Sequence, residues 1–234
     1  MWPFSKKKAD LAEVFRGYTD WHCHILPGVD DGVQTMEDAL AILAQYEAWG
    51  VSDVWLTPHI MEDIPNTTDH LRQRFEELKA AYAADRDQNP GRPGAVTLHL
   101  AAENMMDNLF DERLAAGDLL PIGPKGDHLL VETSYFSPPM DLWGTLARIR
   151  EAGYKPILAH PERYVYMTDS DYERLKAKGV LFQMNLFSQA GAYGKTAQKK
   201  VRDFRSRHWY DISGTDLHRA AFLTHKWPGP IYPL

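Results

Sequence analysis

Residues that can bind a metal ion stand at the end of one short apolar run of the sequence after another. In chain order these residues are His22 and His24, His59, Glu103, Glu132, His160, Asn185, and Asp216 with His218. Neutral imidazoles with carboxylates suit zinc, manganese or iron better than calcium, and the single cysteine excludes an all-thiolate site. If the runs are strands of one parallel sheet or barrel, their carboxyl ends meet on one face and these side chains converge. The pattern therefore predicts a divalent metal site.

The first run carries two of these residues on either side of the only cysteine. Alternate residues of a strand point to the same side, so His22 and His24 share one side and Cys23 takes the other. Asp20 has the parity of the two histidines. Cys23 is followed by His24 and Ile25 and lacks the Cys-x5-Arg loop of thiol-based tyrosine phosphatases. We therefore expect Cys23 to face away from the metals and to take no part in catalysis.

The loop after the histidine pair, Leu26–Gly32, contains two neighbouring aspartates, Asp30 and Asp31. Proline, glycine and aspartate make a turn without any ligand, which is the alternative reading of this segment. Beside a histidine pair we favour an aspartate that reaches back to a metal ion.

The elements that must position these residues alternate along the chain. Short apolar or β-branched runs are followed by segments of helical period, which predicts βα units and a parallel sheet or barrel. The seven expected strands are Thr19–His24, Val54–His59, Val96–Glu103, Leu129–Glu132, Pro156–His160, Leu181–Asn185 and Ile212–Asp216. The expected helices are Thr35–Trp49, Thr68–Asp85, Asp141–Ala152, Asp171–Lys178 and Ala192–Arg207.

Length and composition favour one domain without a membrane span. The 234 residues are 44% hydrophobic and 25% charged, and the net charge is −6. No apolar stretch approaches the roughly 18 to 20 residues that a membrane-spanning helix needs. An acidic, polar segment stands where a signal peptide has its apolar run, and a lone cysteine suits a reducing compartment, so we expect a cytoplasmic protein. The acidic charge and the absence of a basic stripe argue against nucleic-acid binding.

Taken together, the motifs resemble the polymerase and histidinol phosphatase (PHP) superfamily. They are Asp20–Gly32, Thr57–His59, Ala102-Glu103, Val131-Glu132, Ala159–Tyr164 and Gly214–His218. Within the superfamily, the chain is similar to bacterial protein-tyrosine phosphatases that accompany capsule and exopolysaccharide tyrosine kinases. The resemblance runs from about Thr19 to His218. It implies a distorted seven-stranded βα (TIM-like) barrel with two or three divalent metal ions, manganese first and iron, zinc or cobalt as alternatives.

The resemblance also implies how the ligands are shared. One metal ion would be held by His22, His24, Glu103 and Asp216, a second by Glu103, Glu132 and His160, and a third by Asp31, His59 and His218. Glu103 would bridge, because a carboxylate has two oxygens.

Two arginines and one tyrosine are candidates for contact with the substrate. Arg163 resembles the phosphate-binding arginine of the family, whose planar fork matches two phosphate oxygens. Arg219, beside His218, is a second candidate. Tyr135 and Phe136 follow Glu132 and are read first as packing, with stacking on an aromatic substrate as the alternative.

The other histidines have simpler interpretations. Helical or loop context makes His70, His128, His208 and His225 surface or packing residues. His99 shares the strand parity of Glu103 but stands earlier in the strand, so it lies deeper and is read as structural.

The activity that the resemblance implies is hydrolysis of phosphotyrosine on a protein by metal-activated water. The substrate would be the tyrosine-rich tail of a membrane-associated polysaccharide kinase, and the resemblance is compatible with an oligomer. The alternatives are a small-molecule phosphatase of the histidinol-phosphate type and a non-catalytic, metal-stabilised module.

Two segments depart from the family pattern. Residues 1–18 form an N-terminal extension, with a helix expected around Ala9–Phe15, before a single barrel domain over residues 19–234. After His218 the family has a further helix, whereas the prolines and glycine of Trp227–Leu234 exclude one, so this end of the domain is short.

Overall fold

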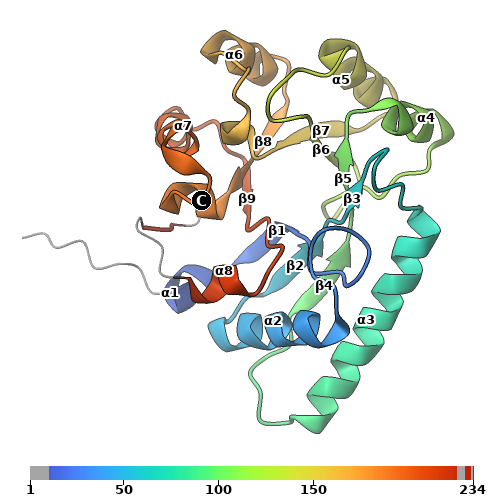
Figure 1. Ribbon diagram of the computed structural model, residues 1–234, viewed down its shortest axis with the longest axis vertical. Coiled ribbons are helices and arrows are strands. Elements are labelled where there is room, and N and C mark those ends of the chain that lie inside the picture. Colours follow the sequence, from blue (N-terminus) through green and yellow to red (C-terminus); the bar gives the residue numbers. More distant parts are fainter. Residues whose placement is uncertain (1–10, 226–229, 233) are drawn as a thin grey trace, which may run out of the picture.

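The computed structural model describes residues 11–225, 230–232 and 234. Strands lie at the centre of the molecule and helices surround them (Figure 1). All pairings between the described strands are parallel. The expected α/β class with parallel strands is therefore confirmed.

The seven expected runs appear as nine described strands, because two of the runs are interrupted. The strands are β1 Thr19–Cys23, β2 Asp53–Leu56, β3 His59–Ile60, β4 Thr97–Leu100, β5 Glu103–Met105, β6 His128–Glu132, β7 Lys155–Ala159, β8 Leu181–Asn185 and β9 Ile212–Gly214. They form two sheets, of order β1-β2-β4 and β3-β5-β6-β7-β8-β9. Pro58, which has no N–H to donate, stands between β2 and β3. The chain crosses from the smaller sheet to the larger there, and again between β4 and β5.

The last strand returns to the first. The Asp216 backbone N–H donates to the His22 carbonyl at 2.7 Å, and the His24 N–H donates to the Leu217 carbonyl at 2.9 Å. An isolated parallel bridge joins Cys23 to Leu217. A Cβ on Gly214 would lie 2.4 Å from the Cβ of His22, so only glycine allows this approach. The two ends of the ligand pattern therefore meet in space.

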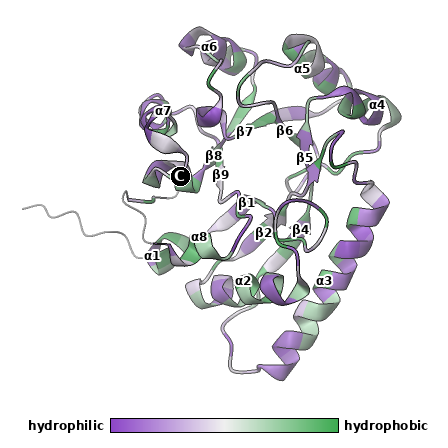
Figure 2. Ribbon diagram, in the orientation of Figure 1, coloured by the Kyte–Doolittle hydropathy of each residue, from purple (hydrophilic) through white to green (hydrophobic). Residues whose placement is uncertain are grey.

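Helices and short 3-10 turns cover the strands. They are α1 Leu11–Phe15, α2 Met36–Trp49, α3 Thr68–Gln88, α4 Asn108–Ala116, α5 Leu142–Glu151, η1 Pro161–Arg163, α6 Asp169–Ala177, η2 Leu186–Ala190, α7 Gly194–Ser206 and α8 Ala221–Thr224. All five expected helices are present with shifted ends, and hydrophilic residues predominate along α3 (Figure 2). None of the described helices is long and apolar enough to cross a membrane.

Helix α4 is an element that the sequence pattern did not predict. Its signals are nevertheless local: the Asp107 side chain accepts from the Phe110 N–H at its start, and Gly117 ends it in the left-handed region with φ 71°. The helix is short and only three of its residues are buried, so its apolar period is weak.

Described residues near both ends of the chain pack against the domain. The Phe15 ring of α1 stacks on Trp49 at 5.2 Å between centroids, while positions 9 and 10 of the expected helix lie outside the described residues. Near the other end, Ile231 is buried, and the Tyr232 carbonyl accepts from Gln189 at 2.8 Å. Positions 227–229 and 233 of the C-terminal segment also lie outside the described residues.

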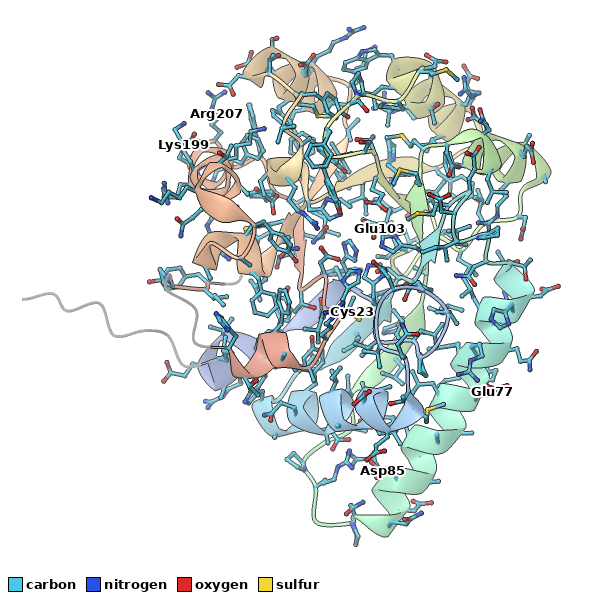
Figure 3. All side chains as sticks on the ribbon, in the orientation of Figure 1. Cys23, Glu77, Asp85, Glu103, Lys199 and Arg207 are labelled. Atoms are coloured by element: carbon cyan, nitrogen blue, oxygen red, sulfur yellow. The ribbon has the colours of Figure 1, made fainter. Side chains whose placement is uncertain are left out.

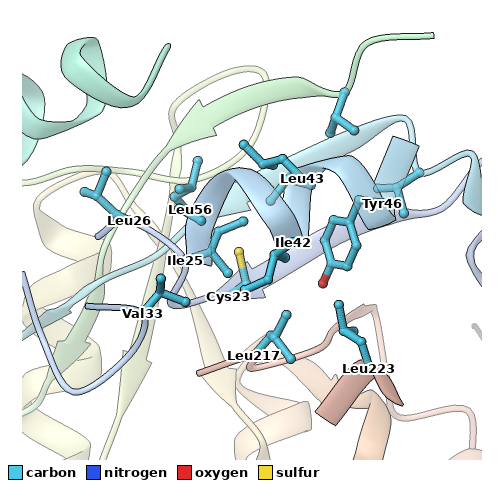
Figure 4. Close-up of a cluster of buried hydrophobic side chains, with 14 of the residues drawn as sticks. Cys23, Ile25, Leu26, Val33, Ile42, Leu43, Tyr46, Leu56, Leu217 and Leu223 are labelled. Atoms are coloured by element: carbon cyan, nitrogen blue, oxygen red, sulfur yellow. The ribbon is translucent and has the colours of Figure 1, made fainter. Parts of the chain in front are cut away.

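Cys23 faces the hydrophobic core on the helix side of β1. Its side chain is fully buried and lies among Ile25, Ile42 and Leu217 (Figure 4). Burial raises the pKa of the thiol well above its usual range, and the nearby Asp20 carboxylate raises it further. The expectation that Cys23 points away from the histidines is confirmed.

Candidate metal centre

Among the residues that the structure describes, three groups of donor side chains gather at the carboxyl ends of the strands. Within each group, one ligand atom from each member lies within 4.8 Å of the others. The groups are His22, His24, Glu103 and Asp216; His59, Glu103 and Glu132; and His24, Asp31, His59 and His218. Shared members join them into one centre, and Glu103 lies near the middle of the molecule, between the strands (Figure 3).

The first group is entirely buried. The Nε2 atom of His22 lies 3.1 Å from Glu103 Oε2 and 3.6 Å from Asp216 Oδ1. For His24 Nε2 the corresponding distances are 3.2 Å and 3.4 Å. Burial lowers the pKa of His22, but the carboxylates of Glu103 and Asp216 outweigh it and raise the pKa to about 9. Two imidazole nitrogens thus point at two carboxylate oxygens, and all four side chains are buried.

The second group contains buried polar atoms that a bound cation would satisfy. His59 Nδ1 lies 3.2 Å from Glu103 Oε2 and 3.0 Å from Glu132 Oε1. All three atoms are buried and lack a hydrogen bond of normal geometry. Buried polar atoms are otherwise almost always satisfied, so this convergence fits a divalent cation. Burial raises the pKa of Glu132, and the charge of Glu103 adds to that rise.

His160 lies beside the second group. Its Nε2 atom is 2.9 Å from Glu103 Oε1 and 3.7 Å from Glu132 Oε2. The resemblance assigns His160 to this set and His59 to the third, whereas the structure brings both imidazoles to the two carboxylates. His160 has φ 32° and Asp216 has φ 52°, a left-handed backbone that is rare for residues other than glycine and is often found at functional sites.

The third group opens to the surface. Asp31 Oδ1 lies 3.4 Å from His218 Nε2 and 3.6 Å from His59 Nε2, and the Asp31 side chain is 67% exposed. A hydrogen bond from His218 lowers the pKa of Asp31. A surface cavity of about 530 Å³ is lined by Asp31, His218 and Arg219. The Arg219 side chain is exposed.

The sequence pattern assigned a positioning role to neither of two residues that hold the histidines. The Gln183 Oε1 atom lies 2.9 Å from His22 Nδ1, and Asp30 Oδ2 lies 2.8 Å from His24 Nδ1. A hydrogen-bond acceptor at Nδ1 fixes the tautomer of each imidazole and leaves its Nε2 atom facing the other candidate metal ligands. Asp30 also accepts from the His59 N–H at 3.0 Å. The signals were present: Asp30 adjoins Asp31, and Gln183 shares the strand side of Asn185.

Asp20 does not join the histidines, despite its parity. The register pairs Asp20 with Val54 and Cys23 with Leu56, so β1 contains a bulge between them. The bulge turns Asp20 outward, where it accepts from Tyr46 Oη at 2.8 Å and Thr215 Oγ1 at 2.7 Å. Asp20 thereby anchors the residue before Asp216.

Arg163 lies at the edge of the centre. Its Nη1 donates to Asp216 Oδ2 at 2.6 Å. The guanidinium carbon lies 4.2 Å from the Tyr135 ring centroid and 4.1 Å from that of Tyr193. Tyr135 also contacts the His160 ring at 5.5 Å, which agrees with its reading as packing. Tyr193 was not among the residues singled out from the sequence.

The other histidines lie outside the three groups. His99 pairs with Asp53 at 2.9 Å and stacks on Trp55, so its structural role is confirmed. His128 pairs with Asp127 at 2.6 Å. The side chains of His70, His208 and His225 are exposed.

Comparisons with known proteins identify a family and several relatives. Residues 18–225 match the family described as Capsular polysaccharide synthesis, CpsB/CapC. The chain is similar to CapC of Staphylococcus aureus, with 26% identity over 87% of this chain and 79% of that protein. It is similar to the tyrosine-protein phosphatase YwqE of Bacillus subtilis, with 25% identity over 75% of this chain and 67% of that protein.

A solved structure shares the fold. It comes from work on YwqE of Bacillus subtilis and CpsB of Streptococcus pneumoniae, described as metal-dependent tyrosine phosphatases. It matches with a TM-score of 0.75 and 23% identity, over 88% of this chain and 81% of the other.

Proposed function

Because this chain belongs to the CpsB/CapC family of capsular polysaccharide synthesis, we propose that it is a metal-dependent phosphatase that hydrolyses phosphotyrosine on proteins. The observation that carries the proposal is the convergence of buried imidazoles and carboxylates in three linked groups. Those groups offer more ligands than one closed structural site uses, which favours catalysis over a purely structural metal.

The proposed ligands follow the three groups. His22, His24, Glu103 and Asp216 would hold one divalent ion, Glu103 and Glu132 with His160 or His59 a second, and Asp31, His59 and His218 a third. We propose two or three ions per chain, manganese first and iron, zinc or cobalt as alternatives. Glu103 supports a bridging role, since Oε2 faces His22 and His59 while Oε1 faces His160.

Divalent cations bound there would supply Lewis-acid chemistry toward a phosphoryl group and would lower the pKa of water. The chain supplies orientation and charge. Arg163 would bind phosphoryl oxygens in its plane, which suits a fork of N–H donors. Gln183 and Asp30 hold His22 and His24 in one tautomer. Cys23 is too deeply buried to form a phosphoenzyme.

The open side of the centre favours a protein substrate. Asp31 is 67% exposed and the cavity beside it reaches the surface, so a phosphotyrosyl side chain projecting from another protein can approach from there. Histidinol phosphate would need a closed polar pocket for its amine. We propose the tyrosine-rich tail of a polysaccharide-biosynthesis kinase as the physiological substrate.

The wider architecture that we propose is a distorted seven-stranded barrel of the PHP type. In it, β2 with β3 and β4 with β5 each count as one interrupted strand. The bridge between Cys23 and Leu217 supports closure of the ring between the first and last strands.

A substrate panel tests the proposed function. Metal-loaded protein is assayed for phosphate release from a tyrosine phosphopeptide, its phosphoserine counterpart and histidinol phosphate. We expect kcat/KM for the tyrosine phosphopeptide to exceed the other two by about 100-fold or more. A preference for histidinol phosphate would replace the proposal by the small-molecule phosphatase. If the metal-loaded protein turns over none of them and chelation unfolds it, the metal-stabilised module is correct.

A further inference from the structure

The guanidinium of Arg163 is enclosed by two aromatic rings from distant parts of the chain. Tyr135 follows β6 and Tyr193 precedes α7, and their centroids lie 4.2 Å and 4.1 Å from the guanidinium carbon. Both rings therefore pack against the same guanidinium, one from the segment after β6 and one from the residue before α7. Rings at this distance attract a cation and restrict rotation of the planar group.

The edge of the same guanidinium is only partly occupied. Nη1 donates to Asp216 Oδ2 at 2.6 Å. Neither Nε nor Nη2 donates to another residue in the described part of the chain. Arg163 therefore keeps N–H donors in its plane for a ligand, while two rings pack against it and its side chain is only 17% exposed.

Tyr193 is itself fixed by the residues that hold Asp216. Its hydroxyl interacts with the Asn185 side chain, whose Nδ2 donates to Asp216 Oδ2 at 2.8 Å. Asn185 is anchored in turn, because its backbone N–H donates to the buried Glu162 carboxylate at 3.0 Å. The ring of Tyr193 and the carboxylate that orients Arg163 are thus parts of one connected network.

We propose that Tyr193, together with Tyr135, is a positioning residue that holds Arg163 in the plane required for two-point contact with the phosphoryl group. This inference rests on the proposed phosphatase function. Loss of either ring leaves the arginine charge in place but frees its plane to rotate and admits water to its face. The positioning function belongs to the ring.

The test combines graded variants with two measurements. Tyr193→Leu removes the ring, Tyr193→Phe keeps it, and Tyr154→Leu, at the amino end of β7, is the matched control. Turnover of a tyrosine phosphopeptide gives kcat and KM, and calorimetric titration with inorganic phosphate gives binding without turnover. We expect Tyr193→Leu to weaken phosphate binding and lower kcat/KM about three- to tenfold, with Tyr193→Phe close to wild type and metal content unchanged.

A double-mutant cycle separates positioning from a general structural effect. In an Arg163→Ala background, Tyr193→Leu should change phosphate affinity by less than about twofold, because the group that it positions is gone. Equal losses with and without Arg163, or an unaltered Tyr193→Leu enzyme, would overturn the inference. If wild-type protein binds phosphate but hydrolyses no phosphotyrosine, the proposed function fails, while the binding cycle still decides the role of Tyr193.

Discussion

Asp216 shows how one side chain in the centre serves two purposes. Its Oδ2 atom accepts from Arg163 and Asn185, while Oδ1 faces the imidazoles of His22, His24 and His218. The division leaves one oxygen for a cation and uses the other for orientation. Burial raises the pKa of Asp216, but the neighbouring positive charges outweigh it and lower the pKa to about 2. The carboxylate therefore stays ionised at neutral pH.

For single residues, the sequence revealed the candidate metal ligands but not the side chains that hold those ligands in place. Histidines and carboxylates at the ends of apolar strands can be recognised in the sequence, because few structural roles require charged or titratable residues at those positions. Gln183 and Asp30 carry weaker signals, the strand side of Asn185 and the neighbouring Asp31, because amides and turn aspartates occur at many positions. Tyr193 carries none. Their contacts depend on which strand ends become neighbours, and only the fold determines that.

Cys23 provides a prediction at the level of one residue. Because the thiol is buried and its pKa is raised, the folded protein should not react with Ellman's reagent at pH 8, whereas protein in guanidinium should react with one equivalent. Cys23→Ala should keep kcat for phosphotyrosine within about twofold of wild type, since the thiol packs in the hydrophobic core. Rapid labelling of the folded protein with loss of activity would contradict this assignment.

Among the secondary-structure elements, β1 and β9 set the positions of candidate ligands of the first group. The bulge in β1 brings His22 inward while Asp20 points outward to Tyr46. A bulge is invisible to parity arguments, which assume strict alternation, and this is why the sequence placed Asp20 with the histidines. The interruption in the run at 96–103 was hidden because Ala101 and Ala102 continue its apolar character, whereas Pro58 marks the interruption in the run at 54–59.

Gly214 should therefore be intolerant of any side chain. In Gly214→Ala the new Cβ would meet the Cβ, N and Cα atoms of His22 at 2.4, 2.6 and 2.9 Å, so one strand must move. We expect about 1 to 3 kcal/mol lower stability and weaker metal binding, measured by urea unfolding and metal titration. The matched control is Gly91→Ala, where an added Cβ meets nothing within 4 Å. Identical behaviour of the two variants would refute the close-approach explanation.

Helices α2 and α3 are joined by a buried carboxylate away from the centre. Glu47 is 1% exposed and accepts from Arg86 at 2.5 Å, Arg92 at 2.6 Å and Tyr82 at 2.5 Å. Glu47→Gln should lower the free energy of unfolding by about 1 to 3 kcal/mol at pH 7, because it removes charge-assisted hydrogen bonds. Glu112→Gln, on the exposed side of α4, is the control.

The stability difference between wild type and Glu47→Gln should depend on pH, and the lowered pKa of Glu47 gives the sign of that dependence. Burial raises the pKa of Glu47, but hydrogen bonds from Arg92, Tyr82 and Arg86 outweigh it and lower the pKa. A carboxyl group with a lowered folded-state pKa stabilises the protein above its unfolded pKa and loses that contribution as pH falls through the folded value. The difference between wild type and Glu47→Gln should shrink below about pH 4. A gap that widens in acid would show that the ion pairs do not stabilise the fold.

For the whole molecule, the periodicity of short strands and helices was enough to predict an α/β fold with parallel strands and its main helices. The convergence of ligand-type residues followed from that fold class, since carboxyl ends of parallel strands share one face. The arrangement into two sheets did not follow, because it depends on backbone hydrogen bonds near Thr57 and Ala101 that no residue pattern encodes. The contact of Asp216 with the chain near His22 likewise requires closure between the first and last strands.

Dependence of phosphotyrosine hydrolysis on the metal centre is the most direct test of the central claim. Phosphate release from a tyrosine phosphopeptide is measured for wild type as isolated, after chelation and after manganese is restored, and for Glu103→Gln beside the control Glu112→Gln. We predict that chelation abolishes release, manganese restores it, and Glu103→Gln lowers kcat/KM by about 100-fold or more with loss of bound metal. Phosphate release that persists after chelation, or a fully active Glu103→Gln enzyme, would contradict the central claim.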